Sequence, residues 1–216
     1  MHLISNILYW ISTGLLVPVI VLLIILFLRS LLLIGSFFGR YMQLRRTGAQ
    51  IDTAIDGLDA AALATAEGRA DLLSRLPRKS SAPVVTCLKR MLESESDDSV
   101  RYAAGLDRML SEFEIVADRD LSTSKTLAKM GPMLGLMGTL IPMGPALVGL
   151  AQGDIASMAY NMQVAFSTTV VGLFAAAVGY VTQQTAQRWY LHDMTTLEYV
   201  AALMKASASS QTEKTE

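Results

Sequence analysis

Three long apolar blocks alternate with polar stretches along the chain. They run over about residues 7–28, 130–150 and 158–181, and none of them contains a charged side chain. A helix of about 20 apolar residues, rising about 1.5 Å per residue, is long enough to cross the hydrocarbon core of a bilayer. The pattern therefore predicts three transmembrane helices.

The first block is predicted to be a membrane anchor. Trp10 lies near its start, where interfacial aromatic residues are common, and Arg29 marks its other end. No Lys or Arg precedes the block and no small-residue cleavage site follows it, so we do not expect a signal peptide. The apolar residues after Arg29 continue this helix, so the first transmembrane region is expected to comprise residues 1–38.

Residues 39–129 are predicted to form a helical region outside the membrane. They hold 14 basic and 14 acidic residues, a mixture typical of a solvated helical surface rather than of a site for a polyanion. Pro77 is expected to end one helix, and a second helix is expected over about residues 82–95. Apolar residues at helical spacing are candidate core positions: Ile51, Ile55, Leu58, Leu63 and Leu72.

The polar segments that flank the second and third blocks are predicted to continue the helices of those blocks. No proline interrupts residues 98–131, so one long helix should enter the second block. The segment after the third block also has a helical pattern, and the last ten or so residues are expected to be disordered. We therefore predict an all-α membrane protein with three transmembrane helices and long cytoplasmic helical extensions. Its expected regions are residues 1–38, 39–129, 130–187 and 188–216.

The distribution of basic residues predicts the orientation in the membrane. All 18 Lys and Arg residues fall within residues 29–129 or after residue 187. Because basic residues accumulate on the cytoplasmic side, the N-terminus and the turn at residues 151–157 should be outside. The long polar region and the C-terminus should be cytoplasmic, in a multi-pass protein of the inner, cytoplasmic membrane.

Composition excludes several classes of function. The chain is 52% hydrophobic and 17% charged, with a formal net charge of −1, so nothing indicates a nucleic-acid partner. The single cysteine, Cys87, cannot form an intramolecular disulfide. The two histidines are far apart in sequence, and no nucleophile–base arrangement can be assembled. We therefore expect no metal site, no cofactor and no enzymatic activity.

The second and third blocks contain small and hydroxylated residues instead of ionisable ones. Such residues recur every three or four positions, which places them on one narrow face of each helix. On the second block this face holds Gly131, Gly135, Gly138 or Thr139, Pro142, Ala146 and Gly149. Pro132, next to Gly131, is counted with the candidate pore-wall and packing residues. On the third block it holds Asn161, Ala165, Thr168 or Thr169, Gly172, Ala176 and Gly179. Either close helix packing or an ion path would account for these faces. Pro142 and Pro145 leave backbone carbonyls without donors, which requires a kink, water or a neighbouring group.

Two motifs in these blocks resemble the ExbB/TolQ/MotA proton-channel family. The stretch "GPMLGLMGT" (131–139) resembles the family pattern A-P-L-L-G-L-L-G-T, and "AFSTTVVGLFAAAVGYV" (165–181) resembles A-L-x-x-T-A-x-G-L-x-x-A. The order of spans and loops is similar to that of the ExbB/TolQ branch. Two departures are Val164, where the ExbB branch commonly has a glutamate, and the two prolines of "IPMGPAL".

The resemblance implies a function that the residues alone do not establish. Five copies are expected to surround a dimeric, single-span partner similar to ExbD, TolR or MotB, whose aspartate carries the proton. Thr139, Thr169 and Thr168 would line the ion pathway, and the small residues would form the pore wall or pack on the partner helices. The chain would then be a stator subunit that couples ion-motive force, from protons or sodium ions, to mechanical work or transport across the envelope. The alternative is a non-conducting oligomeric scaffold whose small-residue faces only pack.

Overall fold

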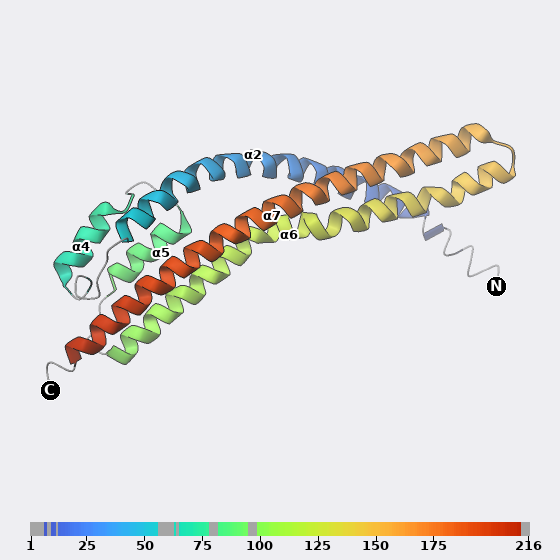
Figure 1. Cartoon of the computed structure of the whole chain (residues 1–216). Coiled ribbons are helices and arrows are strands. Elements are labelled where there is room, and N and C mark those ends of the chain that lie inside the picture. Colours follow the sequence, from blue (N-terminus) through green and yellow to red (C-terminus); the bar gives the residue numbers. More distant parts are fainter. Residues whose placement is uncertain are drawn as a thin grey trace. The chain divides into compact units, whose positions relative to one another are not determined.

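The computed structural model describes residues 7, 10–11, 13–55, 63, 65–77, 82–94 and 99–212. Over these residues the regular elements are all α-helices, which confirms the predicted fold class. Figure 1 shows the long helices and the two short ones. Their bounds are α2 (Leu16–Ile55), α4 (Ala66–Arg75), α5 (Pro83–Leu92), α6 (Ser99–Ala151) and α7 (Ile155–Thr212).

Helices α2, α6 and α7 are long and apolar enough to cross a membrane, as predicted from the three blocks. In α2 the apolar span is Leu16–Gly39. Helix α6 has 53 residues and enters its apolar part without a break, so the predicted long helix is confirmed. Helix α7 has 58 residues and continues well past the third apolar block, also as predicted.

The end of α7 differs from the expectation of a disordered tail. The helix continues to Thr212, several residues beyond the expected start of disorder. Residues 201–209 explain part of this extension, because Ala201, Met204 and Ser207 are buried at helical spacing. Residues 213–216 lie outside the described part of the chain.

The chain divides into two compact units. The first unit comprises residues 1–37 and 122–185, and the second comprises residues 38–121 and 186–216. Each unit has its own buried cluster of apolar side chains.

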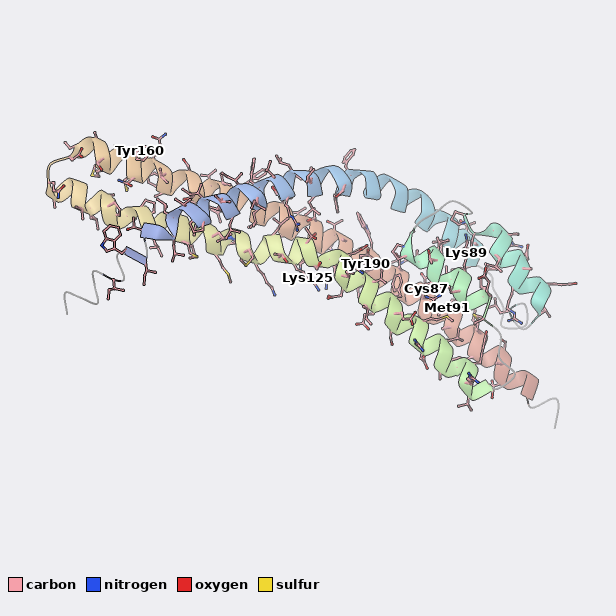
Figure 2. All side chains as sticks on the ribbon, turned by 180° about the vertical axis from the view of Figure 1, so that it is seen from behind. Cys87, Lys89, Met91, Lys125, Tyr160 and Tyr190 are labelled. Carbon is pink, nitrogen blue, oxygen red and sulfur yellow. The ribbon has the colours of Figure 1, made fainter. Side chains whose placement is uncertain are left out.

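The core of the second unit is built around α5. This helix is amphipathic, and Val85 and Met91 are fully buried among residues of α7 such as Leu197 and Val200. Figure 2 labels Met91 and Cys87 on α5 and Tyr190 on α7. Burying one such apolar side chain contributes about 1.5–3 kcal/mol, so this cluster stabilises the unit. Four predicted core positions are buried, namely Ile51, Ile55, Leu63 and Leu72, while Leu58 lies outside the described residues.

Local signals set the ends of the two short helices. The Thr65 hydroxyl accepts a hydrogen bond of 3.2 Å from the Gly68 N–H and so caps the start of α4. Helix α4 ends before Pro77, as predicted. Pro83 begins α5, where its missing N–H costs little. Helix α5 ends at Leu92, slightly earlier than expected.

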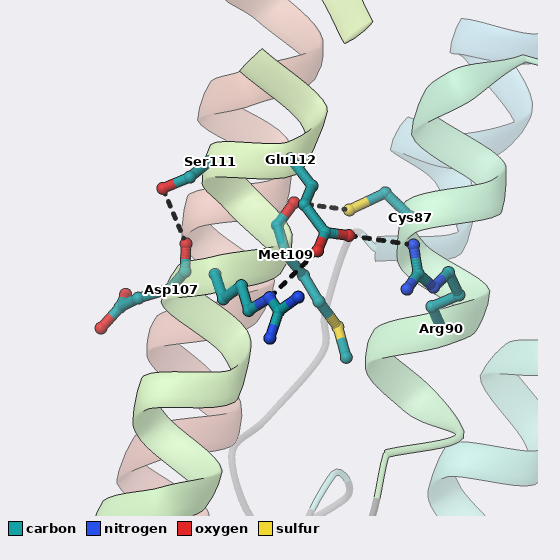
Figure 3. A network of polar contacts seen from close by, with 7 residues as sticks. Cys87, Arg90, Asp107, Met109, Ser111 and Glu112 are labelled. Carbon is teal, nitrogen blue, oxygen red and sulfur yellow. Dashed lines mark hydrogen bonds and ion pairs between the residues drawn. The ribbon is translucent and has the colours of Figure 1, made fainter. Parts of the chain in front are cut away.

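Ion pairs join α5, α6 and α7 at the surface of the second unit. The Glu112 carboxylate of α6 pairs with Arg90 of α5 (Figure 3), with an N–O distance of 3.2 Å. It also pairs with Arg108 at 3.1 Å. Lys205 of α7 pairs with Asp107 at 2.6 Å. These side chains are mostly exposed, so each pair contributes about 0–1 kcal/mol to the stability of the unit. Their main effect is to orient the three helices.

The first unit packs α2 against α6 and α7. Val19 and Leu23 of α2 are buried together with Leu134 and Ile141 of α6. The Phe27 ring of α2 lies 5.7 Å from the Phe174 ring of α7, centroid to centroid. Large apolar side chains elsewhere on this unit are exposed, which suits contact with lipid or with other protein chains.

Candidate functional site

A tight turn brings α6 and α7 together in the first unit. The N–H of Asp154 bonds the Gly149 carbonyl at 2.8 Å and the N–H of Gly153 bonds the Leu150 carbonyl at 3.1 Å, which is the Schellman pattern of helix ends. Gly153 has a φ of 76°, a conformation that side chains disfavour. The Asp154 carboxylate then accepts a 3.0 Å bond from the Ser157 N–H and caps α7.

Below the turn, the glycines of the two helices face each other. A Cβ atom added to Gly131 would lie 2.6 Å from the Gly172 carbonyl oxygen and 3.0 Å from the Ala176 Cβ. A Cβ added to Gly172 would lie 2.9 Å from the Gly135 Cα. Such distances are too short for real side chains, so the two backbones are in direct contact here. We call this contact the seam; its residues are Gly131, Gly135, Gly138, Thr168, Gly172 and Ala176.

Thr168 fills the seam opposite Gly138. A Cβ added to Gly138 would lie 2.6 Å from the Thr168 Cβ. Thr168 is only 8% exposed, and its hydroxyl donates to the carbonyls of Val164 and Ala165 at 3.1 and 2.9 Å. This side chain therefore packs between the helices of its own chain.

The seam ends in a pair of buried hydroxyls that the sequence analysis did not find. Thr182 of α7 lies 3.3 Å from the hydroxyl of Ser124 on α6, and both residues are buried. The neighbouring Gly179 lies against the α6 backbone, because a Cβ there would be 2.6 Å from the Ala128 nitrogen. Ser124 is seven residues before Gly131, and this heptad spacing is the signal that could have placed it on the seam.

Thr139 and Thr169 lie beside the seam, on the side away from α2. Each residue turns an α-helix by about 100°. On α6, Thr139 therefore lies to one side of the seam, and Leu134, which contacts α2, lies to the other side. On α7, Thr169 is displaced from Gly172 toward Leu173, which is 54% exposed, and away from the buried Ala175. Both threonines are half-buried. We call this side, with its two threonines, the open flank.

The hydroxyls of the open flank donate to their own helices. Thr139 bonds the Leu136 carbonyl at 2.7 Å, and Thr169 bonds the Ala165 carbonyl at 3.1 Å. Because a hydroxyl has one donor and two acceptor lone pairs, each oxygen keeps acceptor capacity toward a neighbouring molecule.

The other small residues predicted for a pore wall occupy mixed positions. Ala165 and Ala176 are buried with the seam glycines, and Pro142 and Ala146 are buried on α6. Pro132 and Asn161 are half-buried, and the Asn161 amide donates to the Ser157 carbonyl at 2.9 Å. The sequence left open whether these faces serve packing or an ion path. Within one chain, the glycine face of α6 packs against the glycine face of α7.

No Asp, Glu, Lys, Arg, His or Cys lies within the second or the third apolar block. Among the described residues, no group of three or more His, Cys, Asp or Glu could hold a metal ion. In the second unit, burial raises the pKa of the Cys87 thiol to about 11, an effect that Arg90 partly offsets. A thiol that stays protonated near neutral pH is a poor nucleophile and metal ligand, so Cys87 acts as a small core residue.

The chain is similar to known proteins over more than half of its length. The family model described as the MotA/TolQ/ExbB proton channel family matches residues 80–199. The chain is also similar to a biopolymer transport protein ExbB homolog of Methanothermobacter thermautotrophicus, with 24% identity over 171 residues. That match covers 66% of this chain and 61% of the relative, so the chain spans about three fifths of the relative's length. Since the family model covers more than half of the chain, from α5 through the seam to α7, the chain belongs to the MotA/TolQ/ExbB proton channel family.

Proposed function

We propose that this chain is a subunit of an ion-conducting ring that encloses the transmembrane helices of an aspartate-bearing partner. The partner is expected to be a single-span protein similar to ExbD, TolR or MotB and to be present as a dimer. The ring is expected to contain five copies in the inner membrane, with the N-terminus outside and the C-terminus in the cytoplasm. Ion flow, expected to be of protons, would drive mechanical work or transport across the envelope.

One observation carries this proposal: two hydroxyls are presented on the open flank of spans that contain no acidic residue, basic residue or histidine. Residues 130–153 and 155–187 contain no Asp, Glu, Lys, Arg or His. Crossing the hydrocarbon core requires a polar or titratable group to receive the ion. Thr139 and Thr169 can hydrogen-bond but cannot hold a charge, so the acid must come from another chain.

The hydrogen bonds of the two threonines suggest how they would act beside such an acid. Each threonine hydroxyl donates its hydrogen bond to a backbone carbonyl. Its own oxygen can therefore accept a hydrogen bond from a protonated carboxyl group. When the acid ionises, a hydroxyl can rotate away from its carbonyl and donate to the carboxylate instead. The pair would therefore stabilise both protonation states at one place in the membrane.

A non-conducting scaffold is the second candidate function, and the packing of the seam favours it. Glycine faces that contact each other inside one chain are what helix packing alone requires. Such a scaffold would assemble without a pore and without an acid-bearing partner.

Ion flux measured in proteoliposomes tests the proposal. The chain is co-purified with the product of an adjacent reading frame that encodes one span with an intramembrane aspartate. We expect flux from the complex, and a loss of at least tenfold in the double variant Thr139→Val with Thr169→Val, because valine keeps the shape and removes both acceptors.

The matched control is Thr185→Val, which removes a hydroxyl with the same kind of backbone bond, 2.9 Å to the Val181 carbonyl, on a different face of α7. It should leave flux unchanged. A double variant that assembles normally and conducts like the unmodified complex would remove Thr139 and Thr169 from the pathway. A stable complex that never conducts would favour the scaffold.

A further inference from the structure

We propose that Gln163 on α7 of one chain packs into a notch at Gly144 on α6 of the next copy of this chain. The contact would hold neighbouring copies together within the membrane. This inference rests on the proposed ring of identical chains. It specifies which two helix faces of neighbouring copies are in contact. The occupant of each face is therefore a second copy of the chain rather than lipid or the acid-bearing partner.

Gln163 is a polar side chain exposed within an apolar span. It lies six residues before Thr169, or about 9 Å toward the turn, which is still inside the hydrocarbon core of about 30 Å. Among the residues that the structure describes, no hydrogen bond is recorded for its side-chain amide, although its backbone carbonyl accepts a bond from Ser167. An amide facing lipid is costly, so this face should be covered by protein. Tyr160, three residues closer to the turn and 68% exposed, is a second polar side chain near this end of α7 (Figure 2).

Gly144 leaves a gap in an otherwise bulky face of α6. A Cβ added there would meet nothing within 4 Å, whereas Leu140 and Leu147 beside it are 71% and 62% exposed. A glycine in the middle of a helix costs stability relative to alanine, and here no contact within the chain compensates for it. The gap exposes the α6 backbone to whatever lies against it.

The two positions lie at the same depth. Gly135 and Gly172 are in contact across the seam. Gly144 is nine residues from Gly135 toward the turn, and Gln163 is nine residues from Gly172 toward the same turn. Nine residues correspond to about 13.5 Å of rise and to about half a turn of rotation beyond two full turns. Both positions are therefore level with each other and point away from the seam, on opposite sides of the α6–α7 pair.

The notch also offers an acceptor for the amide. Pro145 follows Gly144 and has no N–H, so the Ile141 carbonyl lacks its usual donor in the helix. This carbonyl belongs to the turn on which Gly144 exposes the backbone. The Gln163 amide has two N–H donors that could satisfy it. The contact would thus give a partner to the Gln163 amide and a donor to the Ile141 carbonyl, whose usual donor is missing at Pro145.

Ring symmetry brings these two faces together. In a closed ring, every copy sits at the same depth and meets its neighbours through two different faces. With the open flank turned toward the centre and α2 packed on the opposite side, two sides of the α6–α7 pair remain. They are the outer face of α7, with Gln163, and the outer face of α6, with Gly144. The α7 face of one copy therefore lies against the α6 face of the next at matching depth.

Disulfide cross-linking of the full complex in native membranes tests the contact. The variant carrying both Gly144→Cys and Gln163→Cys is oxidised and separated on a denaturing gel. We expect a ladder of covalent multimers, because each chain contributes a different cysteine to each neighbour. A bond within one chain is excluded by geometry, since the two positions point away from each other and a disulfide needs Cα atoms closer than about 7 Å.

The matched control replaces Gly144 by a residue on the same face at another depth. Met137 lies one heptad away and is 40% exposed, so the pair Met137→Cys with Gln163→Cys should give at least fivefold fewer multimers. The unmodified chain, with only Cys87, and each single-cysteine variant should give none. A ladder as strong from Met137, or dimers without higher multimers, would overturn the proposed contact.

Native mass spectrometry of the unoxidised variants separates this inference from the proposed ring. A multimer of normal mass that gives no ladder with the Gly144 and Gln163 cysteines would overturn the contact and leave the ring intact. A chain that stays monomeric with and without its partner would overturn both.

Discussion

At the scale of single residues, glycines rather than large side chains bring the backbones of α6 and α7 into contact. Gly172 touches the backbone of α6, and an added methyl group would have to displace backbone atoms rather than a movable side chain. Lipid tails are as apolar as leucine, so packing rather than the hydrophobic effect must hold α6 and α7 together. Each seam glycine permits that packing.

Gly172→Ala is therefore expected to destabilise the first unit. The added Cβ would lie 2.6 Å from the Gly131 carbonyl oxygen, so the helices must separate locally, and overpacking of this kind costs about 1–3 kcal/mol. Thermal unfolding in detergent should show a lower midpoint.

Gly35→Ala in α2 is the control, because a Cβ there meets nothing within 4 Å. It should keep or raise the midpoint, since alanine favours helix by about 1 kcal/mol. Equal midpoints for the two variants would show that the seam is not close-packed.

The position of Thr168 could not have been predicted from the sequence. Thr168 and Thr169 are neighbours, and both lie on the small-residue face of the third span. About 100° of rotation separates them, so only the approach of α6 decides that the first is buried against Gly138 and the second reaches the open flank. The Ser124–Thr182 pair was missed for a related reason, because its members are 58 positions apart and each looks like an ordinary polar residue.

At the scale of elements, the helices follow from local sequence more closely than their contacts do. The spans and their long extensions were predictable, because apolar length and the absence of proline are properties of short stretches. The prolines within α6 are the exception, since the helix runs through Pro132, Pro142 and Pro145 without ending. In a membrane, any alternative backbone would expose more unpaired groups, which keeps the helix intact around each proline.

The turn between α6 and α7 should be sensitive to one glycine. Gly153→Ala places a side chain at a φ of 76°, which costs about 1 kcal/mol or slightly more. We expect a lower unfolding midpoint in detergent, with the fold retained.

Gln152→Ala, at the preceding exposed position, should have little effect on the same measurement. If the two variants have the same unfolding midpoint, the backbone of the turn can relax to accept the alanine. The hydrogen bonds of the turn then do not fix the hairpin.

At the scale of the whole molecule, charge and apolar length together determine how the chain would sit in a membrane. Every basic residue lies in the second unit apart from Arg29, Lys125 and Lys129. Arg29 lies within the apolar span of α2, and the two lysines precede the second apolar block. The turn at residues 151–157 has no basic residue and one acidic residue, Asp154. This asymmetry is the physical basis of the proposed orientation.

Cysteine labelling of intact cells tests the orientation. A membrane-impermeant maleimide should label Gln152→Cys without permeabilisation, and Ser209→Cys only after it. Cys87 should contribute little background in either case, because it is buried and its pKa is raised to about 11, so the reactive thiolate is scarce near neutral pH. Labelling of Ser209→Cys in intact cells would reverse the proposed orientation.

The backbone contact at the seam also limits how the sequence can change during evolution. A clash between two side chains can be relieved by shrinking the opposite residue, which makes such pairs co-vary. At Gly131 and Gly172 the neighbour is a carbonyl oxygen of the facing main chain, which every amino acid possesses. No second substitution across the seam can compensate there. Descendants of this sequence should therefore keep both glycines, or lose both together with the close approach of the helices.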